Sequence, residues 1–92
     1  MKIAAKIIVS GTVQGVFYRK FIKENADKLG LKGFVRNLEN GDVEIFVEGE
    51  KEKIKELLEE AKKGPKYSLV KNVSIEEKKW TGEFKEFKIL SF

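Results

Sequence analysis

Hydrophobic and polar positions recur along this chain with two different periods, and each period marks an expected element. Ile3 to Ser10 is apolar and β-branched enough to form a buried strand. From Tyr18 to Leu29 the apolar positions recur at helical spacing, and Gly30 directly after them is a typical helix stop. The first third of the chain is therefore predicted to be a strand followed by a helix.

The rest of the chain predicts a hairpin, a second helix and two further strands. Asn40-Gly41 is the strongest short hairpin signal, because both positions of its tight turn need positive φ. The strands on either side of this turn are expected over Gly33–Leu38 and, with clear alternation, over Val43–Glu48. An amphipathic helix with Ile54, Leu57, Leu58 and Ala61 on its apolar face follows and ends at Gly64-Pro65. Two further strands are expected, one over Asn72–Glu76 and a short one over Phe87–Leu90 after a Thr81-Gly82 turn.

The order of these elements is β-α-β-β-α-β with a short extra C-terminal strand, in one domain over residues 1–92. This order predicts an α+β, ferredoxin-like sandwich. Both helices should pack on one face of a mainly antiparallel sheet.

The residue types that are missing exclude several classes of function. The chain has no cysteine and no histidine, so thiol nucleophiles, imidazole bases, Ser-His-Asp triads and Cys/His zinc sites are excluded. A site of carboxylates alone remains possible, but no Asp-x-Asp-type loop occurs, and we expect neither a metal nor a cofactor.

We expect a cytoplasmic protein without a membrane segment, because no apolar run approaches about 18 residues and no signal-peptide pattern occurs. Heavy use of lysine and glutamate, with a single glutamine, resembles the composition of thermophile proteins.

The segment between the first strand and the first helix has the features of an anion cradle. It runs from Gly11 to Arg19 and leads into the helix N-terminus, where unpaired N–H groups favour negative charge. Arg19 and Arg36 are the only arginines among 19 basic residues. Because a guanidinium can grip two phosphate oxygens, Arg19 is predicted to close the cradle.

Two motifs resemble those of the acylphosphatase family. Gly11-x-Val13-Gln14-Gly15-Val16-Phe17-Tyr18-Arg19 is similar to its first signature, and Gly33-Phe34-Val35-Arg36-Asn37 is similar to its second. The Asn40-Gly41 hairpin, Glu48-Gly49 and the Gly64-Pro65 stop extend the resemblance over essentially the whole chain.

The resemblance implies metal-independent hydrolysis of acyl phosphates, with a role for each matching residue. Arg19 would bind the phosphoryl group and Asn37 would position the attacking water. The backbone amides of Gly15, Val16, Phe17 and Tyr18 would form the cradle. Acetyl phosphate, carbamoyl phosphate and 1,3-bisphosphoglycerate all fit as substrates, with inorganic phosphate as product and inhibitor. Arg36 is interpreted as a surface or steering charge.

Two alternatives belong to other classes of protein. One is a catalytically silent ferredoxin-like domain with a binding or regulatory role. The other is an RNA-recognition module, which shares the element order and needs exposed aromatic side chains on its central strands. The third expected strand offers only Phe46 for that purpose, and we therefore expect no nucleic-acid partner. The aromatic side chains of Phe46, Tyr67, Trp80, Phe84 and Phe87 are instead expected to pack in or around the core.

Overall fold

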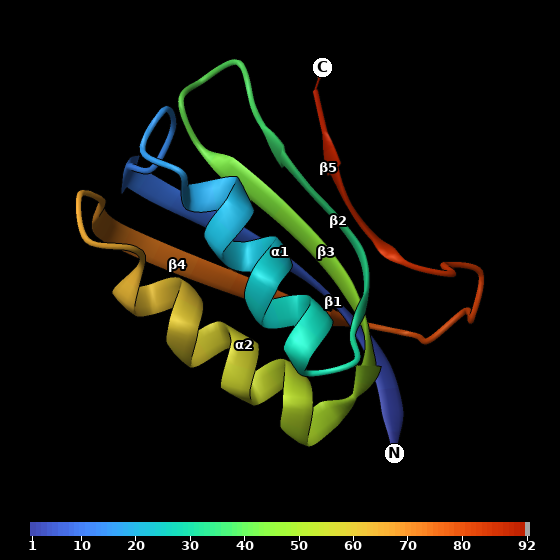
Figure 1. Cartoon of the computed structure of the whole chain (residues 1–92). Coiled ribbons are helices and arrows are strands. Elements are labelled where there is room, and N and C mark those ends of the chain that lie inside the picture. Colours follow the sequence, from blue (N-terminus) through green and yellow to red (C-terminus); the bar gives the residue numbers. More distant parts are fainter. Residues whose placement is uncertain (92) are drawn as a thin grey trace.

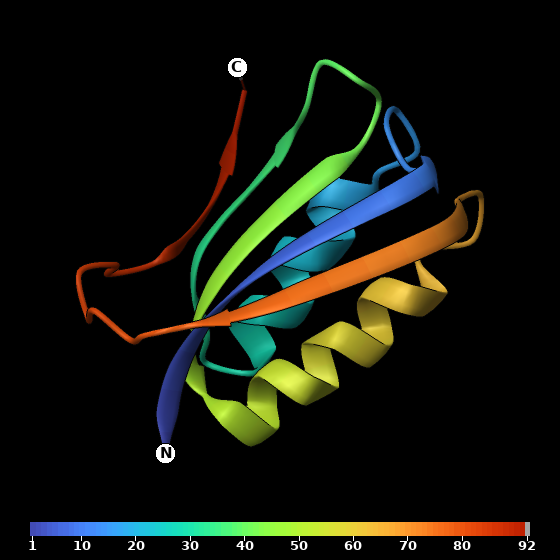
Figure 2. The same ribbon diagram turned by 180° about the vertical axis from the view of Figure 1, so that it is seen from behind.

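The computed structural model describes residues 1–91 of the chain. These residues form β1 (Lys2–Thr12), α1 (Tyr18–Lys28), β2 (Lys32–Asn37), β3 (Val43–Glu50), α2 (Lys51–Lys63), β4 (Leu69–Lys78) and β5 (Phe87–Leu90). The strands make one sheet in the order β4-β1-β3-β2-β5, and both helices lie on the same face of it (Figures 1 and 2).

Strand directions confirm the predicted fold. β1 runs antiparallel to both β3 and β4, and β2 runs antiparallel to β3. β5 is parallel to β2 and extends the sheet by a short strand. The structure therefore has the ferredoxin-like α+β arrangement of a mainly antiparallel sheet with two helices on one face.

The core lies between the sheet and the helices. Alternate residues of the central strands point toward the helices, so Ile7 and Ile45 are fully buried. They belong to the same hydrophobic cluster as Ile22 of α1 and Leu57 of α2. None of the helices within residues 1–91 is long and apolar enough to cross a membrane.

β1 and β4 are longer than their sequence patterns suggest. β1 continues through Gly11 to Thr12, with a register shift between Ser10 and Gly11. Gly11 has φ of 124°, and any side chain at this position would clash with the carbonyl oxygen of Leu69. Most residues of β4 are exposed, and buried and exposed positions do not alternate along it. Its limits are set by the hydrogen-bonded pairing with β1.

The hairpin between β2 and β3 forms, but the expectation of positive φ at both turn positions is wrong. Gly41 has φ of 97°, whereas Asn40 is not left-handed. The Leu38 N–H donates to the Asp42 carbonyl at 2.8 Å, and the Asn40 side-chain oxygen accepts from the Asp42 N–H at 3.0 Å. The hydrogen bond from the Asp42 N–H to the Asn40 side chain stabilises the turn without a positive φ at Asn40, and the strands are joined by a wider loop over residues 38–42.

Aromatic residues also pack on the sheet face opposite the helices. Phe46 of β3 stacks on Phe34 of β2 with ring centroids 5.8 Å apart, and Phe84 lies 5.5 Å from Phe46. Phe46 is therefore a packing residue, as predicted, and not a free platform for bases. The expectation that Tyr67 packs in or around the core is wrong, because this residue is 74% exposed.

Candidate functional site

The loop over residues 13–17 joins β1 to α1 and carries two left-handed residues. Gly15 has φ of 73° and Phe17 has φ of 61°. Phe17 is the N-cap residue of α1, and no side chain accepts a hydrogen bond from the N-terminal N–H groups of the helix. The first turn of α1 also contains no acidic residue. The partial positive charge of the helix N-terminus is therefore not neutralised locally.

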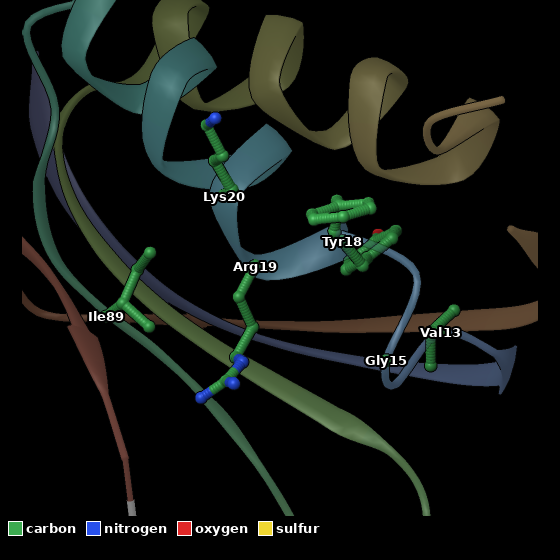
Figure 3. A pocket seen from close by; sticks show the side chains of 7 residues that line it. Val13, Gly15, Tyr18, Arg19, Lys20 and Ile89 are labelled. Atoms are coloured by element: carbon green, nitrogen blue, oxygen red, sulfur yellow. The ribbon is translucent and has the colours of Figure 1, made fainter. Parts of the chain in front are cut away.

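A cavity of about 280 Å³ opens beside this helix N-terminus (Figure 3). This volume lies near the lower limit of about 300 Å³ for ordinary ligand pockets and suits a small ligand. The lining residues come from the loop, the start of α1 and β5, and they are Val13, Gly15, Phe17, Tyr18, Arg19, Lys20 and Ile89.

Arg19 reaches from the first turn of α1 toward the opposite edge of this cavity. Its Nη1 donates to the Leu90 carbonyl of β5 at 2.9 Å. A guanidinium has five N–H donors, so this bond orients the group while using one of them. Lys20 leaves the helix in a different direction from Arg19 (Figure 3).

Asn37 is the last residue of β2 and is not among the residues that line the cavity. It pairs with the buried Val43, and residue alternation places its side chain on the helix-covered face of the sheet. The preceding residue, Arg36, is in register with Leu90, the hydrogen-bond partner of Arg19. The Asn37 Oδ1 is buried and has no hydrogen-bond partner within residues 1–91.

Comparison with known proteins gives a consistent result over the whole fold. The model of the acylphosphatase family matches residues 5–89. An acylphosphatase of Methylococcus capsulatus is 43% identical over 84 residues, which are 91% of each chain. The crystal structure of acylphosphatase from Bacillus subtilis superposes with a TM-score of 0.92 at 37% identity, covering 98% of this chain and 99% of that one. This chain belongs to the acylphosphatase family.

One similarity extends beyond single-domain acylphosphatases. The crystal structure of full-length HypF, in a phosphate- and nucleotide-bound form, matches with a TM-score of 0.87 at 34% identity. The match covers 99% of this chain but only 12% of that one. The acylphosphatase fold therefore also occurs as a small part of a larger protein.

In this acylphosphatase chain, Gln14 fastens the loop to the β2–β3 hairpin. Its Nε2 donates to the carbonyls of Leu38 at 2.9 Å and Asp42 at 2.8 Å. These bonds link the loop to the turn that begins directly after Asn37. Sequence reasoning assigned no role to Gln14, although it is the only glutamine in the chain.

The structure separates the two arginines of the acylphosphatase chain. Arg36 lies on the sheet face away from the helices, and its Nε donates to the Glu44 Oε1 at 2.5 Å. Lys6 approaches the other oxygen of the same carboxylate at 3.8 Å. Arg36 thus belongs to an ion-pair cluster with Glu44 and Lys6, and its side chain is 36% exposed, in keeping with a charge at the surface.

Tyr18 also has a structural partner that the motif did not reveal. Its side chain is almost fully buried, and its hydroxyl donates to the Ala61 carbonyl of α2 at 2.7 Å. Burial raises the pKa of this hydroxyl above its ordinary value. The bond fastens the start of α1, where the loop ends, to the last turn of α2.

A second buried polar anchor holds the segment that precedes β5. Glu48 of β3 is 2% exposed, and its carboxylate accepts hydrogen bonds from the Thr81 N–H, the Thr81 hydroxyl and the Gly82 N–H at 2.8 to 3.0 Å. The chain then leads into β5, which supplies the Leu90 carbonyl to Arg19. Glu48 therefore supports the side of the site formed by β5.

Proposed function

We propose that this chain hydrolyses acyl phosphates to a carboxylate and inorganic phosphate, with Arg19 and Asn37 as its catalytic residues. The backbone N–H groups of Gly15, Val16, Phe17 and Tyr18 would hold the phosphoryl group. The observation that carries this proposal is the position of Arg19, in one cavity with an uncapped helix N-terminus. Membership of the acylphosphatase family supports the same activity.

The Arg19 guanidinium would bind two phosphoryl oxygens side by side. Its bond to the Leu90 carbonyl restricts the orientation of the group, so less conformational freedom is lost when substrate binds. The loop amides and the positive end of α1 add donors that are already oriented. Such preorganised donors stabilise charge that develops in the transition state.

Asn37 would orient the attacking water. Its buried and unpartnered Oδ1 is an acceptor that a water molecule can satisfy. An amide cannot remove the proton from that water, so the proton is proposed to pass to a phosphoryl oxygen. The water oxygen forms a bond to phosphorus while the bond from phosphorus to the acyl oxygen breaks, and the electron pair leaves with the carboxylate.

This reaction suits a chain without histidine or cysteine. A carboxylate leaves as a stable anion, so no strong general acid is needed. Phosphoryl transfer passes through a loose transition state in most analyses, and positioning with charge stabilisation provides most of the catalysis. Inorganic phosphate carries the group that the cradle recognises, and it should therefore inhibit competitively.

The test compares Arg19→Lys with Arg36→Lys in the hydrolysis of benzoyl phosphate, followed by absorbance in the presence of EDTA. Both changes replace arginine by lysine, but only Arg19 lines the cavity. Arg19→Lys should lose about 100-fold or more in kcat/KM, the usual cost of losing one transition-state donor. Arg36→Lys should remain within about twofold of the wild type. Equal activity in the two variants would disprove the role of Arg19.

The alternative function is the one left open by the sequence, a catalytically silent domain that binds or regulates. A folded wild type that binds inorganic phosphate without turnover of acyl phosphates would favour this alternative.

The predicted cytoplasmic location is also a proposal, supported by the lack of cysteine, which suits a reducing compartment.

A further inference from the structure

Phe17 has an unusual combination of conformation and exposure. It is the only residue other than glycine with positive φ among residues 1–91, at 61°. A left-handed conformation costs an ordinary residue roughly 1–2 kcal/mol, whereas glycine adopts it freely. The residue is nevertheless 78% exposed and does not belong to the hydrophobic core cluster. The fold therefore gains little from the phenyl ring at this position.

The ring stands at the edge of the cavity that contains Arg19. Phe17 and Lys20 line both this cavity and a second hollow, which is bordered by Phe21, Glu24 and Pro65. The phenyl ring therefore stands between the two hollows. Apolar side chains of Val13 and Ile89 complete the lining of the first one. The cavity thus combines a cationic group with an apolar wall.

We propose that Phe17 is a specificity-determining residue that contacts the acyl group of the substrate and favours aromatic acyl phosphates over small or charged ones. This inference rests on the proposed function. One oxygen atom joins the acyl group to the phosphoryl group, so the acyl group must lie close to the loop amides. The Phe17 side chain begins at one of these amides and extends into solvent.

The expected preference follows from the chemistry of the ring. Aromatic pairs gain about 0.5–1.5 kcal/mol beyond simple burial of area, which corresponds to roughly 2- to 12-fold in affinity. An acetyl group is too small to cover the ring, and a second phosphate group would remain in water. The preference should therefore appear for flat apolar acyl groups.

Phe17→Gly removes the ring and keeps the backbone N–H that belongs to the cradle. Glycine keeps the backbone N–H and adopts φ of 61° without strain. Tyr67→Ala is the matched control, because Tyr67 is an equally exposed aromatic residue that does not line the cavity.

The experiment measures binding and turnover separately. Calorimetry gives the affinities of phenacylphosphonate and acetonylphosphonate, stable analogues of benzoyl and acetyl phosphate in which a methylene replaces the bridging oxygen. The wild type and Tyr67→Ala should prefer the phenacyl compound by several-fold. Phe17→Gly should lose most of this preference, with each phosphonate affinity expressed relative to the same variant's affinity for inorganic phosphate. The ratio of kcat/KM for benzoyl and acetyl phosphate should fall in parallel.

The two proposals fail in different ways. An unchanged phenacyl preference in Phe17→Gly overturns the role of Phe17, whatever the turnover. Absence of turnover by the wild type overturns the proposed function, while the phosphonate affinities still decide whether Phe17 recognises an aromatic group. Loss of the preference in Tyr67→Ala as well would also overturn the inference, because it would show a nonspecific surface effect.

Discussion

The hydrogen bond between Tyr18 and Ala61 gives a prediction whose magnitude follows from the structure. The Ala61 carbonyl lies in the last turn of α2, where helix carbonyls lack a partner within the helix. The Tyr18 hydroxyl supplies that partner at 2.7 Å, and both residues are fully or almost fully buried. Tyr18→Phe removes the donor and leaves the carbonyl unsatisfied.

The expected loss of unfolding free energy is about 2 kcal/mol at pH 7. A buried group left without its partner costs roughly 1–3 kcal/mol. For a domain of 60–100 residues each kcal/mol lowers Tm by about 4–8 °C, so Tm should fall by roughly 8–16 °C. Tyr67→Phe is the control, because its exposed hydroxyl should contribute less than about 0.5 kcal/mol.

The same substitution predicts a specific dependence on pH. Burial raises the pKa of Tyr18 in the folded state, whereas in the unfolded chain it ionises near the ordinary value of about 10. The stability that this group contributes is therefore complete below pH 10 and falls as the pH rises further. The difference between wild type and Tyr18→Phe should shrink by about 1 kcal/mol between pH 10 and pH 11, because half of the unfolded chains are already ionised at pH 10.

Urea denaturation of both proteins at pH 7, 10 and 11 measures this difference. Lysine deprotonation affects both proteins alike and cancels in the comparison. A difference that stays constant from pH 7 to pH 11 would refute the reasoning about burial of the hydroxyl. A difference below about 0.5 kcal/mol at pH 7 would refute the assigned hydrogen bond.

Two further predictions concern Asn37 and Glu48. Asn37→Ala should lower kcat for benzoyl phosphate far more than it raises the inhibition constant of inorganic phosphate; equal effects on both constants would make Asn37 a binding residue. Glu48→Gln should reduce the unfolding free energy, measured by urea denaturation, by about 1–3 kcal/mol, because buried hydrogen bonds to a charged acceptor are stronger than those to a neutral one. Glu50→Gln, a change in an exposed carboxylate, should have little effect, and similar losses in the two variants would contradict the anchoring role of Glu48.

Much of the fold could be predicted because its signals are local. The helical spacing from Tyr18 to Leu29 predicts the buried face of α1, on which Tyr18, Ile22 and Ala26 are buried. The limits of β4 could not be predicted, because its exposed residues show no period of their own. The hairpin prediction failed in detail because Asn40 bonds to Asp42 instead of adopting positive φ.

The sequence by itself determined the order of elements, the fold class and the segment from Gly11 to Arg19 that leads into the first helix. These properties follow from spacing over a few residues. Tertiary structure alone decided which groups meet across long separations, including Arg19 with Leu90 and Tyr18 with Ala61. It also paired Arg36 with Glu44 across two strands, a contact that the sequence did not indicate. The physical reason is that a hydrogen bond depends on distance and direction in space, which local periodicity does not encode.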